Sequence, residues 1–227
     1  MTGHLAPISW LSIMNMKLET IVVGDFAVNC YLYFSEASKS GIIIDPGAEP
    51  DRIINKVDSL GIKPLAILLT HGHCDHIGAL ADIKERYEIP IYIGKGEEIL
   101  LKDTTENGSA LLGQPFTAPD ADFLFEDETP YSFGDINLRV LFTPGHSRAG
   151  VCLLDETAGI LFTGDTLFQA SIGRTDLPGG SFKILLNSIQ EKILPLPDDI
   201  VCLPGHGPST TVGAERRNNP FFFESMV

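Results

Sequence analysis

The feature that most constrains this chain is a short polar run, Thr-His-Gly-His-Cys-Asp-His, at residues 70–76. It places three imidazoles and one carboxylate directly after the apolar segment 64–69, which predicts a buried strand. Imidazole and carboxylate are side chains that bind zinc, iron and manganese in proteins. Glycine at position 72 allows a sharp turn, so that these side chains can converge. The run therefore indicates a metal site at the end of a strand.

Three further turns carry the same residue types. Each follows a short apolar segment and contains a glycine, and together they supply His146, Asp165 and His206. Every histidine except His4 lies at such a turn. Because functional sites are commonly built on loops held by a rigid sheet, four strands are expected to present these side chains at one edge.

Composition favours one globular domain. The chain has 227 residues, of which 44% are hydrophobic, and we predict an N-terminal extension over 1–15 and a single domain over 16–227. No stretch is long and apolar enough for a membrane span, and no signal peptide is expected. A net charge of −14 disfavours nucleic acid and anionic lipid as partners.

The four cysteines form no C-x-x-C pair and imply no disulfide framework, which favours a cytoplasmic location. Cys30, Cys152 and Cys202 lie within apolar segments and are expected to be small buried side chains. Cys74 lies between potential metal ligands. A thiolate ligand would normally be accompanied by a second cysteine, so we interpret Cys74 as a non-ligand.

Apolar periodicity predicts strands alternating with helices, which is typical of a layered α/β domain. Helices are expected over 49–60, 77–87, 97–102 and 181–193. Strands are expected over 17–23, 28–34, 41–44, 64–69, 91–93, 136–143, 150–154, 160–163 and 200–203. No nucleophile elbow, P-loop or dinucleotide-binding glycine motif is present.

The histidine and aspartate motifs, with the flanking sequences Thr-Gly-Asp-Thr-Leu-Phe at 163–168 and Leu-Pro-Gly-His-Gly at 203–207, resemble those of the metallo-β-lactamase-fold superfamily. Within it, the chain is similar to the short bacterial glyoxalase II, or hydroxyacylglutathione hydrolase, group. The resemblance implies a four-layer αβ/βα sandwich of two mixed β-sheets flanked by helices. It also implies seven metal ligands in two groups and a bridge: His71, His73 and His146; Asp75, His76 and His206; and Asp165 between the groups.

This resemblance implies a metal-dependent hydrolase that acts on thioesters such as S-lactoylglutathione. Two divalent ions, zinc first and iron or manganese as alternatives, would supply a bridging hydroxide that attacks the carbonyl carbon. Asp75 would orient that hydroxide as well as bind metal. A thiolate leaves without a dedicated general acid, because the pKa of its thiol is only about 8.5.

Two other residues have two interpretations each. Arg174 is predicted to bind a substrate carboxylate, or else to form a structural ion pair with Asp176. Asp45 is expected either to hold a ligand imidazole or to be a residue of an Asp-Pro-Gly turn. Longer glyoxalase II enzymes carry a C-terminal helical region that contributes to glutathione binding, and only residues 207–227 follow His206 here.

Three other functions stay open. A persulfide dioxygenase on the same fold would hold one iron through His71, His146 and Asp165. Lactone hydrolysis is a further enzymatic option, which the shape of the pocket would decide. A non-catalytic metal-binding protein would be expected to have lost a ligand, and no ligand position is lost. The expected partner is a small-molecule thioester, and a homodimer is also considered.

Overall fold

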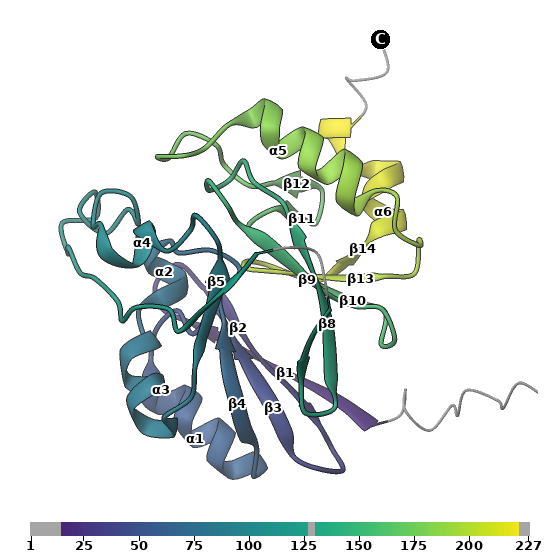
Figure 1. Cartoon of the computed structure of the whole chain (residues 1–227). Helices are drawn as coiled ribbons and strands as arrows, with labels where there is room; N and C mark the ends of the chain where they lie inside the picture. The colour runs from purple at the N-terminus through teal and green to yellow at the C-terminus, as the bar shows by residue number, and fades with distance from the viewer. Residues whose placement is uncertain (1–14, 127–129, 223–227) are drawn as a thin grey trace, which may run out of the picture.

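A computed structural model of the chain describes residues 15–126 and 130–222. The expected extension over 1–15 therefore lies outside the described residues except for its last one. Two six-stranded sheets face each other (Figure 1). The first contains, in spatial order, β1 (Met16–Val23), β2 (Val28–Ser35), β3 (Ser40–Ile44), β4 (Lys63–Leu68), β5 (Ile91–Gly94) and β6 (Phe123–Phe125). The second contains β14 (Thr210–Thr211), β13 (Val201–Pro204), β10 (Ile160–Gly164), β9 (Val151–Asp155), β8 (Ile136–Phe142) and β7 (Pro130–Phe133).

Both sheets are mixed, because β3, β4, β5 and β6 run parallel in the first and β10 runs parallel to β13 in the second. β11 (Leu167–Phe168) and β12 (Ser171–Ile172) form a separate two-stranded antiparallel ribbon. The helices are α1 (Pro50–Leu60), α2 (Cys74–Ile77), α3 (Leu80–Tyr87), α4 (Ile99–Lys102), α5 (Phe182–Ser188), the π-helical turn η2 (Ile189–Ile193), α6 (Val212–Asn218) and the 3₁₀ turn η3 (Pro220–Phe222). None of the helices in the described ranges is long and apolar enough to cross a membrane.

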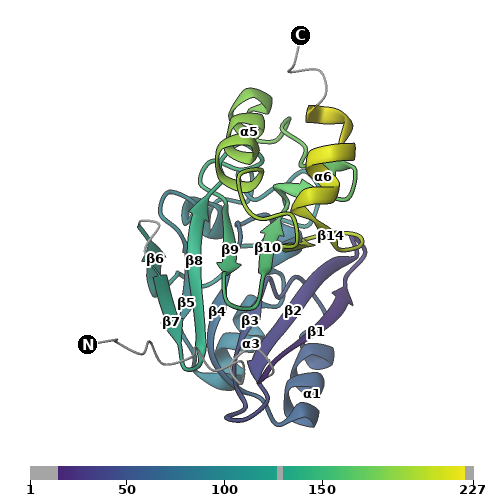
Figure 2. The same ribbon diagram turned by 90° about the vertical axis from the view of Figure 1, so that its right-hand side faces the viewer.

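Three apolar cores separate four layers, which confirms the expected sandwich. Strand β2 shows the reason, because successive side chains of a strand point to opposite faces. Cys30 and Leu32 pack toward α1 and α3, whereas Tyr31 and Tyr33 pack between the sheets. Phe162 of the facing sheet makes edge contacts with both tyrosine rings. The third core lies between the second sheet and α5, η2 and α6, and these helices lie on the outer side in Figure 2.

The two sheets are joined by hydrogen bonds at one edge. The Asn29 N–H donates to the Gly205 carbonyl at 2.7 Å, and the Val151 N–H donates to the Thr70 carbonyl at 2.8 Å. Val28 also forms a β-bridge with His206. These bonds bring the ends of β4, β10 and β13 to the same edge, where the sequence predicted a metal site.

Several elements differ from those expected. The single helix over 77–87 is two helices, because the Ala79 N–H donates to the Pro46 carbonyl instead of to a carbonyl within α2. The last part of the helix over 181–193 is π-helical. Strands β6, β7, β11, β12 and β14 and helix α6 were not predicted. All four cysteines are free, and three of them are buried as expected.

Candidate metal centre

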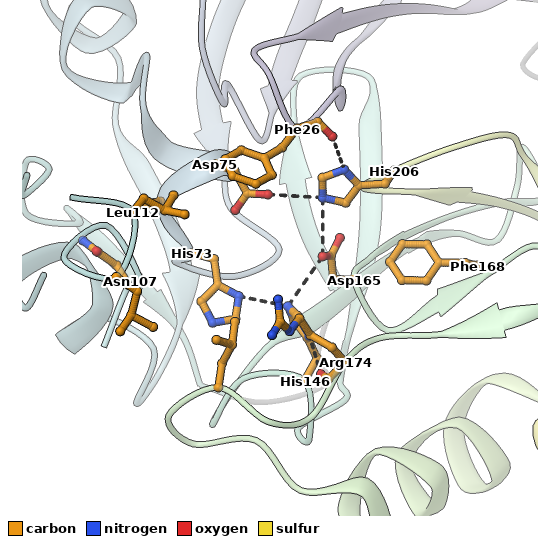
Figure 3. A pocket seen from close by; sticks show the side chains of 14 residues that line it. Phe26, His73, Asp75, Asn107, Leu112, His146, Asp165, Phe168, Arg174 and His206 are labelled. Carbon is orange, nitrogen blue, oxygen red and sulfur yellow. Dashed lines mark hydrogen bonds and ion pairs between the residues drawn. The ribbon is translucent and has the colours of Figure 1, made fainter. Parts of the chain in front are cut away.

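Three histidines from two turns form the first group of possible ligands. His71 and His73 follow β4, and His146 follows β8. His73 Nδ1 lies 2.9 Å from His146 Nε2, which lies 3.3 Å from His71 Nε2. All three side chains are buried. The three nitrogens therefore converge on one point, as the resemblance implied. His73 and His146 face each other in Figure 3.

A second group lies beside the first. Asp75 and His76 belong to α2, and His206 follows β13. His206 Nε2 is 3.2 Å from Asp75 Oδ2 and 3.4 Å from His76 Nε2. His76 is fully buried, whereas Asp75 and His206 are partly exposed. This group therefore lies on the open side of the centre.

Asp165 lies between the two groups at the end of β10. Its Oδ2 is 3.6 Å from His146 Nε2 and 3.5 Å from His206 Nε2, and its Oδ1 is 3.4 Å from His76 Nε2. One carboxylate thus faces nitrogens of both groups. Position 205 next to it requires glycine, because a Cβ there would lie 2.3 Å from Asp165 Oδ1.

Backbone carbonyls fix the orientation of two imidazoles. His146 Nδ1–H donates to the Arg174 carbonyl at 2.8 Å, and His206 Nδ1–H donates to the Phe26 carbonyl at 2.9 Å. Each bond assigns the proton to Nδ1 and leaves the Nε2 lone pair facing the centre. No sequence pattern indicates these two carbonyls, because every residue type carries one.

Asp45 performs both roles that the sequence allowed. It occupies a turn with a left-handed backbone, φ 48°, and its carboxylate is buried. Oδ1 accepts the Thr70 N–H at 2.8 Å, and Oδ2 accepts the Thr70 hydroxyl at 2.6 Å and His76 Nδ1–H at 3.1 Å. Asp45, His71 and His76 are close enough together to form a third possible group. We interpret Asp45 as a hydrogen-bond partner, because its oxygens are saturated by these donors.

The donor set fits metal ions for three physical reasons. Asp165 Oδ1, which faces the centre, is buried without a hydrogen-bond partner among the described residues. The close approach of His73 and His146 nitrogens requires a proton or a cation between them. Burial lowers the pKa of His73 to about 3, so that its ring is neutral and able to coordinate. Burial opposes the ionisation of Asp165, but nearby His76 holds the pKa of its carboxyl well below the usual range. The cluster is therefore compatible with a dinuclear metal centre.

A cavity of about 540 Å³ opens over this centre. Its lining includes Arg174, whose guanidinium forms a bidentate pair with Asp176 at 2.7 Å. Arg174 thus forms the structural ion pair with Asp176 that was one of its two interpretations. Cys74 lies at the cavity wall and belongs to none of the possible ligand groups, in agreement with its interpretation as a non-ligand.

Glu97 is a functional candidate that sequence reasoning missed. Its side chain is fully buried, and it accepts the Gly72 N–H at 3.3 Å and the Ala149 N–H at 2.7 Å. It thereby joins the loop of His73 to the loop of His146. Burial raises the pKa of its carboxyl. No sequence signal distinguishes it from the half-buried Glu98 beside it.

Fold and site define a class of protein: an α/β sandwich with a histidine- and aspartate-rich centre for metal ions. The family model of the metallo-beta-lactamase superfamily matches residues 23–206. This chain belongs to that superfamily. The earlier resemblance is thereby confirmed at the level of the fold and of a metallo-hydrolase superfamily.

Two relatives match almost end to end. "Probable metallo-hydrolase YqgX" of Bacillus subtilis is 44% identical over 207 residues, which cover 91% of this chain and 97% of the relative. "Hydroxyacylglutathione hydrolase GloC" of Haemophilus influenzae is 37% identical over 212 residues, which cover 91% of this chain and 98% of the relative.

Two solved structures have the same fold. BLEG-1 B3 metallo-beta-lactamase is 41% identical with a TM-score of 0.89, over 91% of this chain and 100% of that chain. TTHA1623 in a di-iron-bound form is 36% identical with a TM-score of 0.80, over 90% of this chain and 100% of that chain.

Proposed function

We propose that this protein is a binuclear metal-dependent thioester hydrolase, with S-lactoylglutathione as its reference substrate. The observation that carries the proposal is the pair of three-ligand groups joined by Asp165 at the floor of an open cavity. The similarity to GloC, which is described as a hydroxyacylglutathione hydrolase, supports the same reaction class.

In this proposal the first metal would be held by His71, His73 and His146, the second by Asp75, His76 and His206, and Asp165 would serve both. When bound, such ions supply a hydroxide nucleophile at neutral pH and polarise the carbonyl of the substrate. Zinc is our first choice, and the di-iron form of TTHA1623 supports iron as the alternative.

The residues of the chain position the reacting groups. Asp75 lines the cavity, and its Oδ2 is 3.2 Å from His206 Nε2, so Asp75 is proposed to orient the attacking oxygen. Carbonyl and carboxylate acceptors hold the outer nitrogens of three imidazoles, which orients their inner nitrogens toward the centre. A thiolate leaving group requires no further acid.

The test is hydrolysis of S-lactoylglutathione by the metal-loaded protein, together with measurement of bound metal. Asp165→Ala removes the shared carboxylate and should lower both turnover and metal content. Asp155→Asn is the matched control, because Asp155 is buried but bonds Tyr33 and Ala158 away from the centre. A wild-type protein that contains two metals and hydrolyses no thioester would refute the proposal.

Two outcomes of that experiment would indicate other functions. One bound iron together with oxygen uptake on glutathione persulfide would indicate the dioxygenase. Bound metal without turnover of thioesters, lactones or β-lactams would indicate a binding protein. All residues of the second group are present, and this favours two metals. A cytoplasmic location, a small-molecule thioester as partner, the absence of nucleic-acid and membrane partners, and a homodimer stay predictions.

A further inference from the structure

The cavity over the metal centre continues into a second one. We call the first the metal chamber. The second, which we call the side chamber, has a volume of about 350 Å³ and lies between the β1–β2 turn and the loop over 109–116. Phe26, Cys74, Asp75 and Leu112 line both. We propose that the side chamber binds an apolar, uncharged arm of the thioester substrate, an inference that rests on the proposed function.

The lining of the side chamber is mainly apolar. Val23 and Val28 form its inner wall and are themselves buried, and Ala48 and Phe116 complete it. The chamber could hold roughly ten water molecules, which is far more room than a small lactoyl group requires. Water against such walls gains little hydrogen bonding, so an apolar ligand group would displace it favourably.

Two large apolar side chains stand where the chambers meet. Phe26 is 53% exposed and Leu112 is 51% exposed, although both face the centre of the site (Figure 3). Exposed apolar groups that adjoin a reaction centre are typical of a surface that a ligand covers. The Phe26 carbonyl also accepts the hydrogen bond from His206, so this junction is tied to the metal centre.

Charge excludes an anionic arm. No lysine or arginine lines the side chamber in the described part of the chain, whereas Asp25 and Asp75 do. In the metal chamber the Arg174 guanidinium is already paired with Asp176. A carboxylate or phosphate inside the side chamber would therefore meet Asp25 with no lysine or arginine among the described lining residues to neutralise it. The two carboxylates of glutathione thus gain no cationic side chain as a partner in the side chamber.

Two homologous series of thioesters test the inference. One extends the acyl group on uncharged N-acetylcysteamine from acetyl to hexanoyl, and the other extends the alkyl thiol of acetyl thioesters from ethyl to hexyl. Each buried methylene should raise kcat/KM about fourfold, which is roughly 200-fold over four methylenes. The series that shows the rise identifies the arm in the side chamber.

Substitutions locate the effect. Gln114→Trp fills the side chamber from its exposed rim and should reduce the hexanoyl-to-acetyl (or hexyl-to-ethyl) ratio of kcat/KM toward one. Leu112→Ala widens the junction and should lower the same ratio by loss of contact. Ile184→Ala is the matched control, because Ile184 is 49% exposed and lines neither chamber. It should leave the ratio as in the wild type.

Calorimetry supplies a readout independent of turnover. The thioether S-hexyl-N-acetylcysteamine should bind the metal-free protein with a negative heat-capacity change, and Gln114→Trp should abolish this binding. If kcat/KM rises along neither series, or if Gln114→Trp leaves the ratio unchanged, the proposed role of the side chamber is wrong, while thioester hydrolysis stands. Binding of the thioether without turnover of any thioester would instead overturn the proposed function alone.

Discussion

Substitution of Asp45 by asparagine tests how the outer hydrogen bonds control the metal centre. The exchange preserves size, and asparagine also tolerates the left-handed backbone that this position requires. It replaces one acceptor oxygen by a donating amide. The carboxylate now accepts three bonds, two from Thr70 and one from His76, and an amide oxygen cannot replace all of them.

The consequence should appear on His76. If the amide oxygen takes the Thr70 N–H, the NH₂ group faces His76 Nδ1 at the present 3.1 Å. That nitrogen must then accept, which leaves the ring proton on Nε2, the atom that faces Asp165 and His206. Loss of such an outer partner typically weakens metal binding about 10- to 100-fold. This equals about 1.4–2.7 kcal/mol.

The assay is a competition titration of metal-free protein against a chromophoric chelator, resolved into two binding steps. Asp45→Asn should weaken the step that uses His76, and ¹⁵N shifts of that ring should report the loss of its Nδ1 proton. Asp155→Asn removes a buried carboxylate that accepts from Tyr33 at 2.8 Å, and it should leave both steps unchanged. Equal affinities in Asp45→Asn and wild type, within twofold, would refute the reasoning.

Three further predictions concern sterics, packing and pH. Gly205→Ala should abolish tight binding of at least one metal, measured by metal content after dialysis, because its Cβ would lie 2.3 Å from Asp165 Oδ1. Phe162→Ala should lower the free energy of unfolding of the metal-free protein by about 3–5 kcal/mol in urea titrations, because the ring is fully buried between the sheets. Burial lowers the pKa of His73 from 6.5 to about 3, so the unfolded state binds more protons between these values. The metal-free protein should therefore lose stability on acidification below pH 6.5, by at most about 1.4 kcal/mol per pH unit from this group. His76, whose pKa is raised despite burial because of nearby carboxylates, adds no slope there, since it is protonated in both states. Urea titrations that show constant stability from pH 6.5 to pH 4 would contradict this assignment.

The sequence was sufficient for the fold class and for the turns of the site. A strand of alternating or continuous apolar residues is a local pattern, and β4, β8, β10 and β13 were all visible in it. The histidines and aspartates lie within a few residues of those strand ends, so their general place followed from the same pattern. The helix predicted as continuous over 77–87 failed at Ala79, because the competing acceptor, the Pro46 carbonyl, is distant in sequence.

The tertiary structure decided how those residues are combined. His71 and His76 are five positions apart, yet the nearest nitrogen partner of His76 in its group belongs to His206, which the second sheet supplies. The carbonyls of Phe26 and Arg174, the buried carboxylate of Glu97 and the side chamber depend on contacts between segments that no local pattern relates. Propensity and periodicity act over one element, whereas ligand geometry and cavity shape are set by the packing of two sheets against each other. The sequence by itself therefore determined which residues could bind metal, and only the packing determined which of them meet and what lies beside them.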